Sequence, residues 1–441
     1  MEKVNVIGAG LAGSEAAIYL ANKGIKVDLH EMRPNKTTGA HTSSYCAEFV
    51  CSNSLGATAL TSASGLLKKE IELLGSTLIK EAYNHSVPSG ASLSIDRFGF
   101  SKKITDIIKN HPNITYIEKE ITELPEDGIN IIATGPLTSS LLCEDIIKKT
   151  GSTNFKFFDA IAPIVKKETI NFDKAFYASR WDKGEADFIN CPMTKEEYEN
   201  FYEILTTAET IELKSFEAKF FEGCMPVEVM AKRGVDTLRF GPMKPVGLFD
   251  KRIPTEFKKQ QFYAVVQLRQ DDKEAELYNL VGFQTNLKWS EQKRLIQSIP
   301  GLENAEITRY GVMHANTFIN SPKLLNKTLN TKENKNLFFA GQITGVEGYT
   351  ESIATGLLAG INAYKLIKNE NLIELPNTTM LGALCDYITF EEHKNFQPIN
   401  SNWGIIKEME MDKKTKKDKN LKNTLLSNRS IECIQELKNM I

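Results

Sequence analysis

The sequence feature that most constrains the fold is a glycine-rich turn close to the start of the chain. An expected strand, 4–7, leads directly into Gly8-Ala9-Gly10-Leu11-Ala12-Gly13 and then into a pattern of small and apolar residues typical of a buried helix. Gly8 allows a tight turn, Gly10 allows the backbone to approach a pyrophosphate, and Gly13 allows the helix to lie close to the strand. A phosphate would then lie at a helix N-terminus, where unpaired N–H groups and the helix dipole favour negative charge.

An acidic residue follows at the position that such a turn requires. A second expected strand, 25–30, ends at Glu31, which stands 18 residues after Gly13. A carboxylate at the end of the second strand can accept hydrogen bonds from a ribose diol. A glycine-rich turn set between two strands, with an acid at the end of the second, predicts a dinucleotide-binding domain.

Composition places few limits on the partners of the chain. Its 441 residues predict two or three domains, and a net charge of −2 gives no global field for a polyanion, so a nucleic-acid surface would be a local patch. There is no apolar run of about 20 residues for a membrane span, and the first residues lack the apolar core of a signal peptide. We expect a cytoplasmic protein with no membrane partner, and nothing in the sequence indicates an obligate protein partner.

The cysteines predict neither disulfides nor a metal site. Seven cysteines are scattered along the chain, an odd number with no framework spacing. Cys46 and Cys51 are separated by four residues, but the second cysteine pair of an iron–sulfur site is absent. No paired cysteines and histidines indicate zinc.

Two later segments favour FAD over NAD as the dinucleotide. The strand 131–134 closes in Gly135-Pro136, and the strand 336–340 closes in Gly341-Gln342 before a helix rich in small residues. This pattern is typical of the closing segment of a glutathione-reductase-like FAD domain, in which the polar residue after the strand meets the ribityl chain. The alternative is a second ordinary strand–helix unit. We predict an α/β fold, with a Rossmann FAD domain.

The region between these segments predicts an inserted α+β domain. An amphipathic helical stretch at 194–208 is followed by β-rich segments at 261–269 and 276–285. We assign 1–165 and 302–441 to the FAD domain and 166–301 to a substrate or RNA domain. A lysine-rich stretch, 413–422, is either a solvated face or a source of phosphate contacts.

Two cysteines stand in unusual surroundings. Cys51 lies among polar residues in Val50-Cys51-Ser52-Asn53-Ser54, and Cys224 lies in Gly223-Cys224-Met225-Pro226-Val227-Glu228. Downstream of Cys224, the cations Arg233, Arg239 and Lys244 could lower the pKa of a thiol or hold phosphates. The alternative for either cysteine is a small buried hydrophobic residue.

These two cysteine motifs, together with four further segments, resemble the folate- and FAD-dependent tRNA uracil-5-methyltransferase family. The further segments are Ser179-Arg180-Trp181, Asn190-Cys191-Pro192-Met193, Arg309-Tyr310-Gly311-Val312-Met313-His314 and Phe396-Gln397-Pro398-Ile399-Asn400. The resemblance extends from the first strand to about Gly404. It implies methylation of uridine 54 in the T loop of tRNA to 5-methyluridine, with methylenetetrahydrofolate as carbon donor, FAD as cofactor and NAD(P)H as reductant.

The resemblance also assigns roles to residues of this chain. Cys224 matches the family's proposed nucleophile, which adds to C6 of uracil so that C5 can attack a one-carbon electrophile. Cys51 matches its second active cysteine, which stabilises the flavin-bound methylene or helps to remove the C5 proton. Arg233, Arg239, Lys244 and Tyr349 are candidates for binding a flipped-out base and its backbone. His314 either polarises a carbonyl or has a structural role.

Two departures from the family pattern leave the RNA substrate open. Gly56 and Ala315 stand where the family usually carries basic residues. The alternative substrate is a uridine of 23S ribosomal RNA. Two hypotheses from other functional classes also remain. One is a flavin thiol–disulfide oxidoreductase that uses Cys51 and Cys224, and the other is a non-catalytic RNA-binding protein that retains FAD. The sequence holds no second glycine-rich turn, so NAD(P)H would have to use the flavin face directly.

Overall fold

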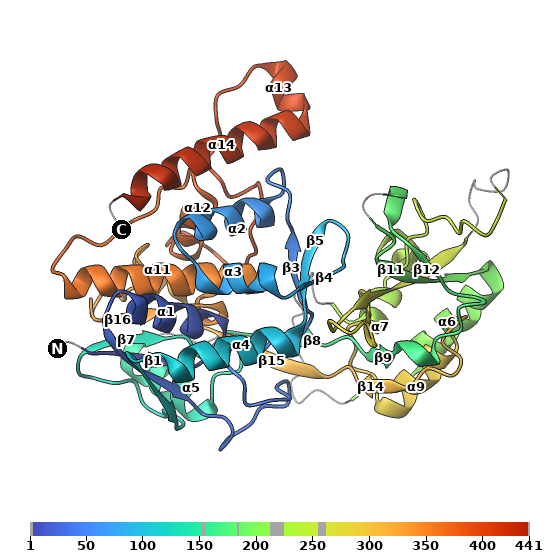
Figure 1. Cartoon of the computed structure of the whole chain (residues 1–441), viewed down its shortest axis with the longest axis horizontal. Helices are drawn as coiled ribbons and strands as arrows, with labels where there is room; N and C mark the ends of the chain where they lie inside the picture. The colour runs from blue at the N-terminus through green and yellow to red at the C-terminus, as the bar shows by residue number, and fades with distance from the viewer. Residues whose placement is uncertain (1–2, 152–154, 183–184, 212–224, 255–261, 440–441) are drawn as a thin grey trace.

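The computed structural model describes residues 3–151, 155–182, 185–211, 225–254 and 262–439. Within them the chain forms a larger lobe, which carries the first and last elements, and a smaller lobe made from the middle of the chain (Figure 1). The apolar cores of the two lobes are separate, with one centred on residues such as Val6 and Leu357 and the other on residues such as Phe201 and Leu268.

The larger lobe is built on a five-stranded parallel sheet with the strand order β16-β7-β1-β2-β6. The strands are β1 (Lys3–Ile7), β2 (Lys26–Glu31), β6 (Ile114–Glu118), β7 (Ile129–Ile132) and β16 (Leu337–Phe339). The consecutive residues Phe338 and Phe339 are both fully buried, so both faces of this strand are covered, as parallel sheets require. The predicted α/β class is confirmed.

Two helices of this lobe pack together along small residues. They are α1 (Leu11–Asn22) and α11 (Tyr349–Ile367), which lie side by side in Figure 1. A Cβ atom placed on Gly356 would stand 2.3 Å from the carbonyl oxygen of Ala12. The small residues predicted for the closing helix therefore allow it to approach the helix that follows the glycine-rich turn. The other helices of the lobe are α2 (Ala63–Leu73), α3 (Thr77–Asn84), α4 (Arg97–Asn110), α5 (Ser140–Thr150), α10 (Ser321–Leu324), α12 (Met380–Ile388), α13 (Lys413–Lys417) and α14 (Lys419–Lys438).

The smaller lobe is an antiparallel sheet with helices packed against it. Its six strands run in the order β10-β11-β12-β13-β9-β14. They are β9 (Ile164–Lys166), β10 (Phe176–Ala178), β11 (Phe188–Met193), β12 (Ala264–Gln270), β13 (Leu277–Leu280) and β14 (Ile307–Arg309). The helices are α6 (Lys195–Thr207), α7 (Val227–Ala231), α8 (Thr237–Phe240) and α9 (Trp289–Gln297).

The predicted helix at 194–208 corresponds to α6, and its start follows from local chemistry. The side chain of Thr194 accepts a hydrogen bond from the backbone N–H of Glu197, whose carboxylate accepts one in return from the N–H of Thr194. This capping box satisfies two of the free donors of the first turn. Tyr198, Phe201 and Leu205 then follow at helical spacing and are buried.

The sheet of the smaller lobe includes strands at both ends of the predicted insert. β9 contains residues that precede 166, and β14 lies after 301, yet the two strands pair with each other. Short strands connect the lobes: β8 (Phe155–Ala160) pairs with β15 (Met313–Phe318), and β3 (Ser54–Ala57), β4 (Ser86–Val87) and β5 (Ser92–Ile95) form a small sheet. The division at 166 and 301 stays a prediction.

Among the described residues, no helix combines the length and the apolar character that crossing a membrane would require.

Candidate functional site

The three glycines of the first turn have distinct surroundings. Gly8 has a φ of +98°, and a Cβ atom there would stand 2.6 Å from the carbonyl oxygen of Ala133. A Cβ atom on Gly13 would stand 1.8 Å from the carbonyl oxygen of Gly8, so this glycine lets α1 lie against the strand. Gly10, in contrast, has no atom within 4 Å of such a Cβ position. The turn is therefore packed on its protein side and open where a ligand would approach.

The open side of the turn is the N-terminus of α1. Gly10 is its N-cap and provides no side-chain acceptor for the first N–H groups of the helix. Free N–H groups and the helix dipole together favour an anionic ligand at this point. Leu11 and Ala12, the next residues, line the adjoining cavity.

Glu31 lies at the end of β2, beside the turn. One of its carboxylate oxygens accepts a hydrogen bond from the backbone N–H of Ala9 at 2.9 Å, and the other accepts one from Nε of Arg33 at 3.0 Å. Burial opposes ionisation, but hydrogen bonds and the charge of Arg33 outweigh it and hold the pKa of Glu31 below its usual value. The side chain is therefore a carboxylate with remaining acceptor capacity, as binding of a ribose diol requires.

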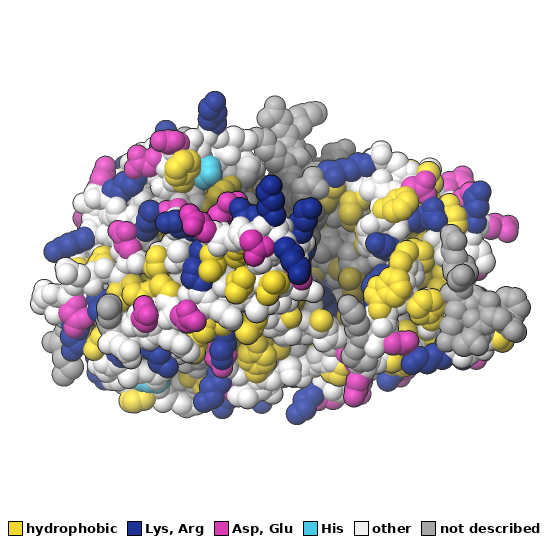
Figure 2. All heavy atoms as spheres, turned by 90° about the horizontal axis from the view of Figure 1, so that it is seen from above, with side chains coloured by type: hydrophobic (Ala, Val, Ile, Leu, Met, Phe, Trp, Pro, Cys, Tyr) yellow, Lys and Arg dark blue, Asp and Glu magenta, His cyan; other side chains and the backbone are white. Residues whose placement is uncertain are grey.

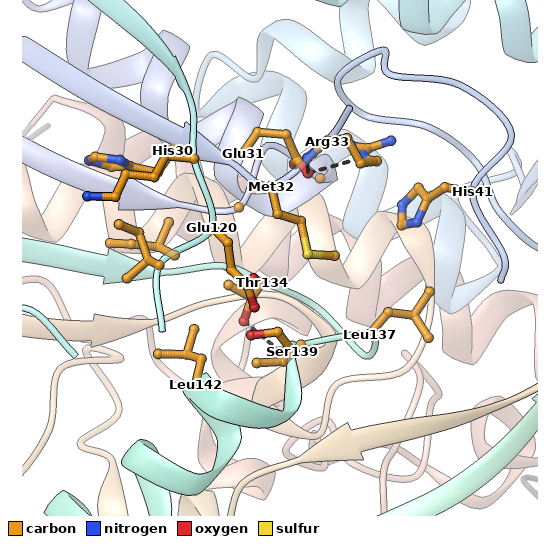
Figure 3. A pocket seen from close by; sticks show the side chains of 16 residues that line it. His30, Glu31, Met32, Arg33, His41, Glu120, Thr134, Leu137, Ser139 and Leu142 are labelled. Atoms are coloured by element: carbon orange, nitrogen blue, oxygen red, sulfur yellow. Dashed lines mark hydrogen bonds and ion pairs between the residues drawn. The ribbon is translucent and has the colours of Figure 1, made fainter. Parts of the chain in front are cut away.

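A cavity of about 540 Å³ opens beside Glu31. Figure 3 shows Glu31 and Arg33 on one side of it, with Thr134 and Ser139 on the other. A second cavity, of about 570 Å³, continues past Gly10 along α1. The two cavities share wall residues, namely Gly10, His41, Thr134 and Leu137.

The second cavity is lined by predicted cofactor-binding residues from segments that lie far apart in the sequence. Its lining includes Gly10, Leu11, Ala12, Gly135, Gly341, Gln342 and Tyr349. Gly341 has a φ of +82° and directs the chain from β16 past Ala12, and the amide nitrogen of Gln342 donates to Glu347 at 2.5 Å. Two joined cavities, with a helix N-terminus between them and a carboxylate at one end, fit the two halves of a dinucleotide such as FAD.

Cys51 is hydrogen-bonded to Tyr349, a residue that lines this second cavity. The backbone N–H of Cys51 donates a hydrogen bond of 2.7 Å to the hydroxyl oxygen of Tyr349, the first residue of α11. The thiol is free and half-buried, and Sγ lies 3.4 Å from the carbonyl oxygen of Ala160. The structure therefore places one predicted catalytic cysteine next to the predicted flavin end of the cofactor site.

Cys51 also lines a third cavity, of about 880 Å³, between the lobes. Cys224, the other predicted catalytic cysteine, lies outside the described residues. Its neighbour Met225 lines the third cavity together with Cys51. The remaining lining residues are Ser52, Ala162, Met230, Pro242, Arg269, Asn279, Leu280, Val281, Gly282 and Gln284.

Three arginines that the sequence analysis did not assign to the site lie around Cys51, and one of them, Arg309, stands in a segment that carries the family resemblance. Arg97, at the start of α4, donates from Nη1 to the carbonyl oxygen of Cys51 at 3.3 Å. Arg309, on β14, donates from Nη2 to the carbonyl oxygen of Val50 at 2.9 Å. Arg269, on β12, lines the third cavity itself. Arginines on separate elements share no local spacing, so only the fold brings them together.

One carboxylate pairs directly with Arg97. Asp271 accepts hydrogen bonds from Nε and Nη2 of Arg97 at 3.1 and 2.7 Å. Burial, followed by the charge of Arg97, lowers the pKa of Arg309, and the same two causes lower the pKa of Arg269 to about 10. The neighbourhood of Cys51 is therefore electropositive.

Three other predicted substrate residues, Arg233, Arg239 and Lys244, are not among the described residues that line these three cavities. Arg233 and Lys244 are exposed. Arg239 is engaged by protein groups, since it pairs with Asp236 at 2.6 Å and stacks 3.5 Å above the ring of Tyr263. The backbone of His314 lies on β15, but its side chain lies outside the described part of the chain.

In the described ranges, no group of three or more histidine, cysteine, aspartate or glutamate side chains is placed to hold a metal ion.

The chain matches a family model and many known proteins. Residues 3–371 match the model of GIDA, glucose inhibited division protein A. A relative from Bacillus velezensis is 54% identical over 100% of this chain and 99% of its own length, and one from Bacillus subtilis (strain 168) is 55% identical over the same shares. A relative from Bacillus mycoides is 56% identical over 99% of both chains. All three are named methylenetetrahydrofolate--tRNA-(uracil-5-)-methyltransferase TrmFO.

Solved structures agree on the fold. GidA of Aquifex aeolicus, in its form II crystal, superposes with a TM-score of 0.69 and covers 99% of this chain and 73% of its own, at 17% identity. At that identity the likeness concerns the fold alone. The match over residues 3–371 and the close relatives over the whole length show that the chain belongs to the GIDA family, within the TrmFO methyltransferases.

Proposed function

We propose that this chain methylates C5 of a uridine in tRNA, with methylenetetrahydrofolate as the carbon donor, FAD as the bound cofactor and NAD(P)H as the reductant. The observation that carries the proposal is full-length identity of 54–56% to relatives named for this reaction. The geometry supports the proposal, because the cavities that would hold the dinucleotide and the loop that carries Cys51 meet at Tyr349.

Different residues of the two joined cavities would bind different parts of the cofactor. Glu31 would hold the ribose of the adenosine half, and the N-terminus of α1 at Gly10 would hold the pyrophosphate. Gly341, Gln342 and Tyr349 would surround the flavin half. When bound, FAD supplies the redox and one-carbon chemistry of the reaction.

The thiols supply the chemistry that uracil itself lacks. C5 of uracil is a weak nucleophile until a thiolate adds at C6, which places negative charge on the ring and its O4. Cys224 is proposed as that nucleophile, and Cys51 as the thiol that assists at the flavin or removes the C5 proton.

The RNA would reach this site between the lobes. A base in the T loop must leave its stack to enter an enzyme pocket. Figure 2 shows a furrow between the two lobes, with lysine and arginine side chains on both sides of it. Such a surface can neutralise backbone phosphates without reading sequence.

A methyl-transfer assay tests the proposal. The FAD-loaded protein is incubated with NADPH, labelled methylenetetrahydrofolate and either unmodified tRNA or 23S ribosomal RNA. We expect label in tRNA, at uridine 54. Label only in ribosomal RNA would show that ribosomal RNA, and not tRNA, is the substrate. This part of the experiment is motivated by Gly56 and Ala315, which stand where the family usually carries basic residues. Reduction of disulfides without label in either RNA would instead support the oxidoreductase, and FAD binding with neither activity would support a non-catalytic RNA-binding protein.

A further inference from the structure

The third cavity, between Cys51 and the smaller lobe, has the lining expected of a pocket for a flat polar ring. Its apolar side chains include Met225, Met230, Pro242 and Leu280. Its polar side chains besides Cys51 and Ser52 are Arg269, Asn279 and Gln284. Polar groups placed among apolar side chains fix the orientation of a ligand through its hydrogen-bonding edge.

Arg269 is a member of this lining that uses little of its hydrogen-bonding capacity. A guanidinium has five N–H donors. Among the described residues, Arg269 makes one side-chain hydrogen bond, from Nη2 to Oδ1 of Asn279 at 3.3 Å. Its Nε is buried and has no partner there. A buried donor without an acceptor is costly, so such a group in a pocket points to an acceptor supplied by a ligand.

The charges around Arg269 favour an acceptor that carries negative charge. The neighbouring Arg97 is paired with Asp271, whose Oδ1 also accepts from Asn279 at 3.0 Å. Arg309 is bonded to backbone carbonyls, which carry no net charge. Among the described residues, Asp271 is the one carboxylate that forms an ion pair with any of these three guanidiniums, and its partner is Arg97. Burial, followed by the charge of Arg97, lowers the pKa of Arg269 to about 10.

We propose that Arg269 binds O4 of the target uracil and is the residue that selects uracil over cytosine. The proposal rests on the proposed function. When a thiolate adds to C6, the electrons of the C5–C6 double bond move into the ring and O4 becomes an enolate oxygen, with no group leaving. A guanidinium at O4 stabilises this charge as it develops. Cytosine presents an amino group at the same position, a donor that Arg269 cannot accept from.

The test combines variants of Arg269 with changes at the target base. Single-turnover methyl transfer is measured for FAD-loaded wild type, Arg269→Gln and Arg269→Lys on a tRNA transcript. We expect transfer by Arg269→Gln to fall about 100-fold and by Arg269→Lys about 10-fold. FAD content, the rate of flavin reduction by NADPH and the Kd for tRNA stay within about threefold of wild type. Arg294→Gln, which removes an exposed cation of α9, serves as the control and retains wild-type transfer.

A second arm does not depend on the variants folding. A transcript carrying 4-thiouridine at the target position replaces O4 by sulfur, a weaker acceptor. We expect wild type to lose about 10-fold in transfer and Arg269→Gln to lose almost nothing further, because the contact is already absent. If wild type is insensitive to this replacement, or if Arg269→Gln transfers at the wild-type rate, the proposal is overturned.

Two other results would also overturn it and would identify a different anionic ligand. A raised KM for methylenetetrahydrofolate with unchanged kcat would indicate a folate carboxylate. A weakened Kd for tRNA with a salt slope reduced by about one would indicate a phosphate contact. Wild type that methylates no RNA would refute the proposed function itself, which separates that failure from the failure of the Arg269 assignment.

Discussion

At the scale of single residues, the central contact is the hydrogen bond between Cys51 and Tyr349. It joins the loop that carries the thiol to the first residue of α11, whose side chain lines the predicted flavin cavity. The ring of Tyr349 also packs against Phe49, with centroids 4.4 Å apart, which fixes the direction of the hydroxyl. Tyr349 was predicted as a substrate residue, and its contacts support a positioning role for the Cys51 loop.

Replacing Tyr349 tests this role. Tyr349→Phe leaves the N–H of Cys51 without its acceptor, and an unsatisfied buried donor costs about 1–3 kcal/mol. We expect FAD to remain bound and methyl transfer to fall about 10-fold, as measured by kcat under saturating tRNA and folate. Tyr202→Phe, which removes a hydroxyl bonded to the carbonyl of Ala231 in the smaller lobe, is the control. Equal kcat values for the two variants would contradict the positioning role.

Residues whose function depends on local geometry could be predicted, and those that depend on assembly could not. The glycines of the first turn and Glu31 lie within one strand–helix–strand unit, so their spacing carries the signal. Arg97, Arg269 and Arg309 lie on three elements from both lobes. Their spacing in the sequence gives no sign that the three meet in space, although Arg309 stands in a segment that carries the family resemblance. Arg239 gives the converse case, since its sequence setting indicated a ligand and its guanidinium contacts Asp236 and Tyr263.

At the scale of elements, the pairing of α1 with α11 holds the two ends of the cofactor site together. α1 presents its N-terminus to the pyrophosphate position, and α11 begins at the flavin end. Their close approach needs glycine at 356, because a Cβ atom there would overlap the backbone of Ala12. The small-residue pattern of this helix, read from the sequence as part of a flavin motif, has this steric reason.

Gly356→Ala should therefore separate the two helices. Overpacking of this kind costs about 1–3 kcal/mol, and we expect a lower Tm together with a lower fraction of bound FAD. Both are measured on the purified protein, by thermal unfolding and by the flavin absorbance. Gly39→Ala, at a position with no atom within 4 Å of the added Cβ, should change neither quantity. A normal flavin content in Gly356→Ala would contradict the proposed coupling.

A second element-scale contact joins the C-terminal helix to the larger lobe. Glu70 of α2 accepts hydrogen bonds from the N–H groups of Met380 and Leu381 at the start of α12 and from the hydroxyl of Ser430 on α14. Burial raises the pKa of Glu70 to about 7, although these hydrogen bonds oppose the rise. The folded state therefore binds this proton more tightly than the unfolded state.

The sign of the pH dependence follows from that shift. Because the pKa is higher in the folded state, the contribution of Glu70 to stability is greatest below its unfolded pKa, declines as pH rises towards 7, and is constant above that. Glu70→Gln cannot titrate. We expect the stability of wild type relative to Glu70→Gln to be larger at about pH 5 than at about pH 8. Denaturant unfolding at both pH values measures it, and a pH-independent difference would contradict the assignment. Glu72→Gln, on the exposed side of α2, is the control.

At the scale of the whole molecule, the two lobes meet at the residues of the site. Asn53, two residues after Cys51, donates to the carbonyl of Ile95 in the larger lobe and to that of Gln270 in the smaller lobe, at 3.0 and 2.9 Å. Its own oxygen accepts from Asn279 at 3.3 Å. The position of the lobes and the position of the thiol are therefore set by the same segment.

Asn53→Ala should destabilise the junction between the lobes and also the position of the Cys51 thiol. It leaves two buried carbonyl groups without a donor, at a cost of about 1–3 kcal/mol. We expect a lower Tm, measured by calorimetry, and methyl transfer reduced by more than FAD binding. Asn110→Ala, which removes an exposed side chain bonded to the carbonyl of Asp106, should leave both unchanged. Loss of stability with fully retained transfer would show that the junction does not position the site.

The most direct test of the account is nucleoside mass spectrometry of tRNA after one reaction with ¹³C-labelled methylenetetrahydrofolate. We predict that ¹³C appears in the methyl group of 5-methyluridine, at a single position of the tRNA, and that Cys51→Ala and Cys224→Ala each abolish it while FAD stays bound. Unlabelled tRNA from the FAD-loaded wild-type protein, or labelling by both cysteine variants as fast as by wild type, would contradict this mechanism.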